Sequence, residues 1–544
     1  MLFNSYPFIF VFLPIALAGF ALIGRTGSHR GVIGWLITCS VAFYGVWNPV
    51  SLAIIAPSIA VNYALARWIQ AEGKEASAQR RAGWILAAGV AFNVCFLGYF
   101  KYKNFFIETI NETSGTHWPL LSTLLPLGIS FITFQKIAFL VDVRAGAIER
   151  FSKLDFLTFV FFFPQLIAGP IVHYREMMPQ FDAMDPRLQA KHLAVGLCLF
   201  AIGLFKKTML ADGIAPYVSS IFASAEHGEA VGLANAWIGA LAYTLQIYFD
   251  FSGYSDMAIG LARMFGIRLP ANFDSPLKAA SITEFWLRWH MTLTRFLMAY
   301  VYTPLVMRYT RARLAQRKPV IGRGPPTLAA FTILIAWPTM VTMGLSGLWH
   351  GAGWTFVLWG VLHGCYLIIN HAWRLLRPKW DKKVYERRML PIGFALTFIG
   401  VVVAMVLFRA RTLSGALRMY ESMLGLGGVT LPEAVLTRLG AIGRWLTSVG
   451  VTADLSSGAT LAASLLGVAA LLAIALILPN SLETMARFEP AINFDAKAVQ
   501  RAGALPTLRF AAALEPRWAV VVGVIFSLGL LCLNSVSEFL YWQF

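Results

Sequence analysis

The chain has 544 residues, of which 58% are apolar or aromatic and 13% are charged, with a formal net charge of +18. This composition excludes a disordered chain, a collagen-like fibre and a small disulfide-rich scaffold, and it lies outside the range of ordinary soluble proteins. The apolar runs predict an all-α, polytopic membrane protein, with residues 1–544 forming a single integral membrane domain. Because the basic residues cluster in short loops between apolar runs, we interpret them as a topology signal and expect no nucleic-acid partner.

Candidate membrane spans need about 17–25 predominantly apolar residues. They lie near 5–24, 32–48, 50–67, 83–100, 119–141, 193–211, 232–250, 327–349, 353–372, 389–408, 459–479 and 518–536. The first run lacks a basic n-region and a small-residue cleavage site, so we interpret it as a span and not as a signal peptide.

Basic loops set the expected orientation. Segments 308–326 and 373–388 are rich in arginine and lysine, as are the loops after the first and third runs. Placing them in the cytoplasm puts both termini outside the cytoplasm. Residues 409–458 then become an extracytoplasmic loop and 480–516 a cytoplasmic loop, while the acidic segment 212–230 belongs to the outer face.

Two segments conflict with this simple scheme. Residues 156–172 contain Pro164, Gly169 and Pro170, which interrupt helical hydrogen bonding. Such backbone survives at membrane depth only where protein or water covers it, so a re-entrant segment is expected, with a kinked span as the alternative. Lys206–Lys207 interrupts the run 193–211, so either these lysines line a polar interior or the topology differs there by one crossing.

Two acids stand in an otherwise apolar, aromatic stretch. Asp250 and Asp256 occur within a run that is expected to enter the membrane. A carboxylate there carries a free-energy cost unless it faces a bundle interior or a wet cavity, which makes both acids candidate supporting residues. The alternative is a helix end at the interface, where the same acid costs little.

The stretch SITEFWLRWH (281–290) has helical spacing. Glu284 and Arg288 are four residues apart and can pair along one helix face. Trp286 and His290 share this spacing, which predicts an aromatic wall beside an imidazole, and Trp289 lies between them in sequence.

Histidines carry the chemistry that this sequence can offer. His290, His350 and His363 combine apolar surroundings with small or aromatic neighbours. His350 lies in SGLWHGAGW, where Trp349 and Trp354 are expected to enclose the imidazole and the glycines permit close backbone approach. A neutral histidine suits general base catalysis, and a histidine that packs between helices is the alternative.

Common cofactor and metal motifs are absent from the sequence. The histidine spacing does not follow HExxH, and neither a phosphate loop nor a GxSxG nucleophile elbow occurs. We therefore expect no bound metal or cofactor.

Several blocks of the sequence resemble the membrane-bound O-acyltransferases. These are QIYFDFSGYSDMAIGLARMFGIRLPANFDSP, SITEFWLRWHMTLTRF and GLWHGAGWTFVLWGVLHG, preceded by FITFQKIAFLVDVRAG (131–146) and FFPQLIAGPI (162–171). The likeness is strongest to the bacterial branch typified by the alginate O-acetylation membrane protein, and it covers about residues 90–375, the expected catalytic core. Leu287, Ala271, Met298 and Ala299 depart from the family pattern, which puts the acceptor and the partner in question.

The resemblance implies a fold, a reaction and a location. The fold would be a ring of roughly 11–13 transmembrane helices with re-entrant segments around a central cavity. His350 matches the family's signature histidine and His290 a second family histidine. The protein would reside in a bacterial inner membrane, in contact with lipid, and acetylate an exported polysaccharide, either directly or through a periplasmic SGNH-type acetyltransferase as a partner.

The expected mechanism joins both lines of reasoning. His350 would accept the proton of an acceptor hydroxyl that attacks an acyl thioester, with acetyl-CoA as one donor. His290 would hydrogen-bond the thioester or the oxyanion, helped by the indole of Trp286 or Trp289. Two alternatives stay open: transfer of D-alanyl or another acyl group from a carrier protein, and a polysaccharide export or transport component.

Overall fold

The computed structural model describes residues 2–72, 75–229, 231–322, 327–377, 381–454, 458–494, 508, 511–533 and 540. Helices make up 76% of the described residues. Within the described ranges, seven helices are long and apolar enough to cross a membrane, and two shorter apolar helices, Phe8–Gly24 and Pro516–Leu531, accompany them. The predicted class, an all-α polytopic membrane protein, is confirmed.

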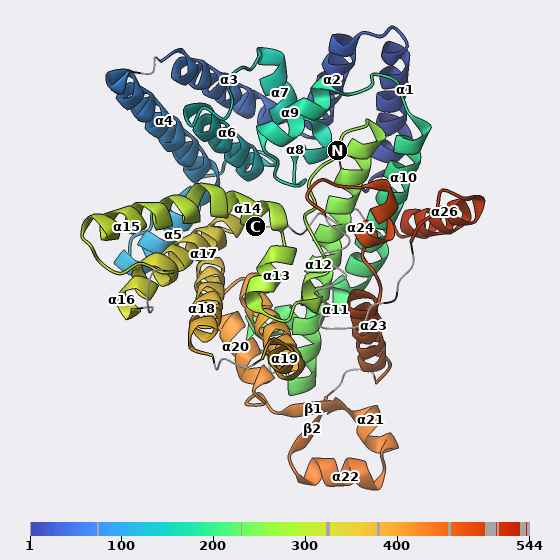
Figure 1. Ribbon diagram of the computed structural model, residues 1–544. Helices are drawn as coiled ribbons and strands as arrows, with labels where there is room; N and C mark the ends of the chain where they lie inside the picture. The colour runs from blue at the N-terminus through green and yellow to red at the C-terminus, as the bar shows by residue number, and fades with distance from the viewer. Residues whose placement is uncertain are drawn as a thin grey trace.

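The N-terminal third forms a bundle at one end of the molecule (Figure 1). Its elements are a π-helical turn (Phe8–Phe12), α1 (Leu13–Gly24), α2 (His29–Trp47), α3 (Pro49–Ala71), α4 (Ala76–Leu97) and α6 (Ile129–Arg144). A second π-helical turn, Gly98–Tyr102, joins α4 to α5 (Lys103–Ser114). The predicted span 119–141 was too long, because its helix begins only after Pro126 and Gly128, whose φ is +68°.

The segment 156–172 has the broken backbone that its prolines and glycine predict. α7 (Lys153–Phe161) and α8 (Phe163–Leu166) are separated at Phe162, and residues 167–173 are not helical. α9 (Tyr174–Asp182) follows, and its start lines the same surface cavity as Asp155 in α7. The chain thus returns to the side from which it came, as a re-entrant segment would, and entry of this segment into the membrane stays a prediction.

Helix α12 (Leu233–Met264) is the central element of the fold and is longer than the predicted span 232–250 (Figure 1). It crosses α10 (Ala190–Phe205) with the two backbones in contact. A Cβ atom on Gly203 would lie 2.5 Å from the carbonyl oxygen of Gly253. Small residues at such crossings are typical of packed membrane helices.

The helix after α10 does not end where the sequence suggested. It continues through a π-helical turn, Lys206–Ala211, into α11 (Asp212–His227), so the loop expected at 212–230 is helical up to His227. Both lysines of the turn contact acids of α12, which favours a polar interior as the explanation of Lys206–Lys207.

The segments that follow α12 build the other half of the molecule. They are a 3₁₀ turn (Pro276–Lys278), α13 (Ile282–Arg288), α14 (Met291–Leu297), a π-helical turn (Met298–Tyr302), α15 (Thr303–Ala315), α16 (Leu328–Phe331), a π-helical turn (Thr332–Ala336), α17 (Trp337–His350), α18 (Trp354–Leu376) and α19 (Lys382–Arg409). Glu284 and Arg288 form the predicted ion pair along α13, with a distance of 2.8 Å.

Residues 410–454 form short elements. The first, α20 (Leu413–Met423), packs against α11, α12 and α19. The others lie beyond the helical body and are β1 (Val429–Pro432), α21 (Glu433–Arg438), α22 (Ala441–Ser448) and β2 (Val451–Asp454) (Figure 1). β1 and β2 pair in parallel, with Val429 opposite Val451. That this region is extracytoplasmic stays a prediction.

The C-terminal part adds helices against the central ones. These are α23 (Gly458–Ile477), α24 (Ser481–Thr484), a 3₁₀ turn (Ala486–Phe488) and α26 (Pro516–Leu531). Much of the predicted cytoplasmic loop 480–516, namely residues 495–507, 509 and 510, lies outside the described residues, as does Lys74.

Candidate active site

His350 is the last residue of α17 and is buried among aromatic rings. Its ring centroid lies 4.9 Å from Trp349, 5.0 Å from Trp359 and 5.1 Å from Phe408. Trp359 reaches it because α17 and α18 pack closely at Gly347 and Gly360. His350 therefore stands where three helices, α17, α18 and α19, meet.

His290 lies in the short connection between α13 and α14, with none of its surface exposed. Its ring centroid is 6.4 Å from that of His350 and 5.9 Å from that of Trp349. Its φ of +43° falls in the left-handed region, which is uncommon for a residue with a side chain. Such a conformation costs about 1–3 kcal/mol and persists only where the surrounding structure enforces it.

That surrounding structure is the segment 272–274, which runs beside 288–291. Asp274 N donates to Arg288 O at 2.9 Å, and Met291 N donates to Asn272 O at 2.9 Å. These two backbone bonds flank Trp289 and His290 and hold the unusual turn in place.

The side chain of Asn272 sets the tautomer of His290. Asn272 Oδ1 is 3.0 Å from His290 Nδ1 and also accepts from the Thr292 backbone N–H at 3.3 Å. Because a backbone N–H can only donate, this amide atom is the oxygen, and Nδ1 of neutral His290 must carry the proton. Nε2 of the neutral ring is then a hydrogen-bond acceptor.

A cavity of about 160 Å³ reaches His350. Its walls include Trp349, the segment 125–131 and Lys101. Lys101 Nζ donates to the carbonyl oxygens of Trp349 at 2.6 Å and of His350 at 3.2 Å. These carbonyls belong to the end of α17 and lack helical partners, so Lys101 caps the helix that carries the histidine.

His363 of α18 lies on the other side of Trp359. The centroids of the His363 and Trp359 rings are 4.8 Å apart, and those of His363 and Trp286 are 5.2 Å apart. Neither ring nitrogen of His363 has a hydrogen-bond partner among the described residues. Over the same residues, no group of three or more histidine, cysteine, aspartate or glutamate side chains could hold a metal ion.

Comparison with known proteins decides the family. Residues 142–317 match the model of MBOAT, the membrane-bound O-acyltransferase family. The chain is 38% identical over 458 residues to the peptidoglycan O-acetyltransferase of Helicobacter pylori, covering 79% of this chain and 81% of that protein. It is 39% identical over 439 residues to the probable alginate O-acetylase AlgI of Azotobacter vinelandii, covering 80% of each. The chain belongs to the membrane-bound O-acyltransferase family.

The name of a more distant relative contains a different acyl group. The chain is 25% identical over 440 residues to the teichoic acid D-alanyltransferase of Streptococcus thermophilus, covering 74% of this chain and 93% of that protein. Membership of the family makes the protein an acyltransferase and confirms the resemblance drawn from the sequence blocks.

The tryptophans of the acyltransferase are placed differently from one another. Trp349 packs against both histidines, whereas Trp354 is 47% exposed and contacts Phe105 at 5.5 Å. Trp359 takes the enclosing position that was expected for Trp354. It lies about one and a half helical turns further along α18, on the face that packs against α17. Trp289 packs on Phe273 and Phe285 beside His290.

Trp286 and His290 do not share one helix face as their spacing suggested. Helix α13 ends at Arg288, and the left-handed conformation of His290 breaks the helical register. The Trp286 ring instead lies 5.7 Å from Trp359 and 5.2 Å from His363. Its indole N–H, like that of Trp359, has no acceptor among the described residues.

Asp250 and Asp256 make their ion pairs away from the histidines. Asp250 Oδ1 lies 2.7 Å from Lys207 Nζ, and Asp256 Oδ2 lies 2.7 Å from Lys206 Nζ. Ser481 Oγ also donates to Asp256 at 2.7 Å. These contacts tie α12 to the π-helical turn after α10 and to α24, and they account for both acids as a structural cluster.

Reasoning from the sequence missed four residues of the site. Asn272 stood in a recognised block, and Lys101 was the first cation after a long apolar run, so each carried a weak signal. Trp359 was one of several tryptophans in its block. Phe408 lies beyond the predicted 90–375 core, and no local pattern connects it to His350.

Proposed function

We propose that this acyltransferase moves acetyl from a cytoplasmic thioester to hydroxyl groups of an exported polysaccharide. The observation that carries the proposal is the pair of buried imidazoles 6.4 Å apart, one of which lines a cavity. At this separation, a reacting group that enters the cavity beside His350 would lie close to both rings. The names of the relatives in Helicobacter pylori and Azotobacter vinelandii favour acetyl as the acyl group.

The reaction forms one bond and breaks one. The acceptor hydroxyl oxygen attacks the thioester carbonyl carbon, His350 takes the hydroxyl proton, and the C–S bond then breaks. The proton passes from His350 to the leaving thiolate, so the histidine ends as it began. General base assistance of this kind contributes about 10²–10⁴-fold to the rate, and the buried site keeps water from the thioester.

His290 has a role other than the donor that the sequence suggested. With its proton held on Nδ1 by Asn272, neutral His290 presents Nε2 as an acceptor and is suited to orient the acceptor hydroxyl. Stabilisation of the oxyanion needs donors instead. The indole N–H groups of Trp286 and Trp359 are buried without acceptors among the described residues, and we assign this role to them.

The test is the ester content of the polysaccharide that the host exports. We compare wild type with His350→Ala at matched abundance in the membrane, and measure both ester-linked acetate and ester-linked D-alanine. We expect acetate to fall to background in the variant while the amount of exported polymer is unchanged. Loss of D-alanine instead would establish the D-alanyl alternative.

A third outcome would favour the export alternative. If the variant retained the polymer inside the cell while the exported fraction kept its acetate, a transport role would explain the result better. Unchanged acetate and unchanged export would contradict the catalytic role of His350.

The location and the partner are separate proposals. We propose an inner-membrane protein with both termini outside the cytoplasm, supported by the basic loops 308–326 and 373–388. Reporter fusions to each terminus test this orientation. A periplasmic SGNH-type partner is tested by crosslinking in intact cells, and acetylation by the chain in the absence of any second protein would contradict it.

A further inference from the structure

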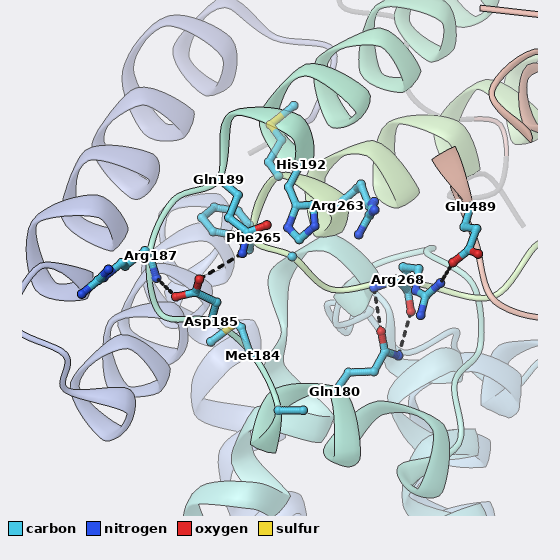
Figure 2. Close-up of a pocket in the computed structure, with 13 residues that line it drawn as sticks. Gln180, Met184, Asp185, Arg187, Gln189, His192, Arg263, Phe265, Arg268 and Glu489 are labelled. Atoms are coloured by element: carbon cyan, nitrogen blue, oxygen red, sulfur yellow. Dashed lines mark hydrogen bonds and ion pairs between the residues drawn. The ribbon is translucent and has the colours of Figure 1, made fainter. Parts of the chain in front are cut away.

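A second cavity lies apart from the histidines. It has a volume of about 410 Å³ and shares no lining residue with the cavity at His350. Figure 2 shows its walls, which come from the end of α9 and the loop after it, the start of α10, and the C-terminal end of α12 with the turn that follows. The residues assigned to acyl transfer and the ion pairs of α12 do not line it.

The most buried cation of this cavity is Arg263, in the last turn of α12. Only 7% of its surface is exposed. Its Nε atom has no hydrogen-bond partner among the described residues, and the bond from Nη2 to Phe488 O is long, at 3.5 Å. Burying a guanidinium without an ion pair costs free energy. An anion bound beside Arg263 would offset that cost.

The two acids of the cavity are already engaged. Glu489 pairs with Arg268 at 2.6 Å. Asp185 accepts from Arg187 N and from Gln189 Nε2, each at 3.0 Å, which fixes its own loop (Figure 2). Arg268 is therefore neutralised by Glu489, and Arg187 directs its guanidinium away from the other lining residues (Figure 2), so Arg263 is left facing the cavity without an ion pair among the described residues.

The cavity is built from braced segments. Gln180 Oε1 accepts from Arg268 N at 2.9 Å, and Gln180 Nε2 donates to Arg268 O at 3.0 Å (Figure 2). Gly266 has a φ of +82°, and a Cβ atom there would lie 3.2 Å from His192 Nδ1, so the turn approaches the histidine as only glycine permits. Phe265 anchors the same turn against Phe20, with ring centroids 5.2 Å apart.

We propose that this cavity binds the phosphate group of a ligand, with Arg263 as its buried counter-charge and Arg268 as a second contact. The planar fork of arginine matches phosphate oxygens, and a cavity of about 410 Å³ holds a phosphate together with an attached group. The proposal does not depend on the acyl-transfer reaction.

The position of the cavity leaves two sources for the phosphate. The loop that carries Arg187 packs against the end of α1, since a Cβ on Gly24 would meet Pro186 O. Arg25 follows directly, so the cavity lies near the basic loop after α1, which the sequence predicts to be cytoplasmic. A soluble nucleotide-type thiol and the headgroup of an anionic lipid can both reach the cytoplasmic face.

The test measures binding by the full-length chain in nanodiscs. The soluble arm titrates coenzyme A, with pantetheine, which lacks phosphate, as the control. The lipid arm compares the melting temperature in phosphatidylglycerol nanodiscs with that in phosphatidylcholine nanodiscs. Each arm is run on wild type, Arg263→Gln, Arg268→Gln and the matched surface control Arg25→Gln.

We expect wild type and Arg25→Gln to respond in one of the two arms, either by binding coenzyme A or by a higher melting temperature in phosphatidylglycerol. In Arg263→Gln, the affinity for coenzyme A should fall about tenfold, or the stabilisation by phosphatidylglycerol should be lost. Arg268→Gln, whose side chain is partly exposed, should weaken the same response and serves if Arg263→Gln does not fold. If coenzyme A binding depends on these arginines, the ligand is soluble. If stabilisation by phosphatidylglycerol depends on them, the ligand is a lipid. If neither response depends on Arg263 or Arg268, the proposal is wrong and Arg263 only stabilises the C-terminal end of α12.

Discussion

Two polar regions lie inside this apolar chain, one on each side of α12, and they are built on different principles. The histidine centre contains neutral rings, His290 and His350, which hydrogen bonds and aromatic packing hold in place. The cluster of Lys206, Lys207, Asp212, Asp250 and Asp256 contains full charges, with Lys206 paired to Asp256 and Lys207 paired to both Asp212 and Asp250. Polar residues at membrane depth therefore need not be catalytic: compensated charges can hold helices together, whereas the candidate chemistry lies where neutral groups face a cavity.

The largest effect is expected from the charged cluster. Lys207→Met leaves the buried carboxylate of Asp250 without its closest cation, and breaking a buried pair costs about 3–5 kcal/mol. We expect a large loss of thermal stability, measured by the melting temperature in nanodiscs. The double variant Lys207→Met/Asp250→Leu should recover most of it, and a double variant as unstable as the single one would contradict the structural assignment.

Lys101 should show the opposite behaviour, with a large effect on activity. Lys101→Met removes the charged donor to the last carbonyls of α17, and such hydrogen bonds contribute about 1.5–3 kcal/mol. If that energy serves to position His350, acyl transfer should fall by about 10–100-fold. Ester-linked acetate per amount of membrane protein measures it, and Lys101→Arg should restore part of the activity.

A purely structural lysine would give a different pattern. The melting temperature of Lys101→Met would then fall as steeply as its activity, and the variant protein that remained folded would acetylate at the wild-type rate.

Asn272 should have a smaller effect that acts through His290. Asn272→Ala releases the Nδ1 proton of His290, so the ring can adopt the other tautomer. We expect acyl transfer to fall about tenfold and its pH profile to shift, because the group that faces the substrate has changed. Asn272→Asp keeps the acceptor and should retain more activity, and an unchanged pH profile in Asn272→Ala would argue against the tautomer assignment.

The smallest effect separates two tryptophans of one sequence block. Trp354→Ala removes a ring that is 47% exposed, whereas Trp359→Ala opens the wall against which His350 packs. We expect Trp354→Ala to retain more than about half of the acetyl transfer, since such peripheral changes are usually within about 0.5 kcal/mol. Trp359→Ala should retain far less, and equal losses in the two variants would contradict this placement.

The sequence predicts the fold class, and the two histidines that it singles out, His290 and His350, lie near each other in the structure, while their catalytic roles stay a prediction. Apolar runs locate most spans because a bilayer demands long helices, and the prolines and glycine of 156–172 predict the broken backbone of that segment. The pairing of Glu284 with Arg288 follows from helical spacing alone. These predictions succeed because each depends on local physics.

Contacts between segments that are far apart in the sequence could not be predicted from local patterns. The spacing of Trp286 and His290 assumed a continuous helix, but the left-handed turn at His290 is imposed by the segment 272–274. Asp250 gave no sign that Lys207 would neutralise it, because the packing of α10 against α12 brings together segments that are distant in sequence. Phe408 reaches His350 from α19, a helix that no motif connects with the site.

One measurement tests the central claim most directly: ester-linked acetate per amount of exported polymer, compared at matched membrane abundance in three variants. These are His350→Ala, His290→Ala and the ion-pair replacement Lys207→Met/Asp250→Leu. The account predicts acetate near background in both histidine variants and at least about half of the wild-type level in the replacement variant. Retained acetylation in the two histidine variants, with loss in a stably folded replacement variant, would place the chemistry at the charged cluster and contradict the account.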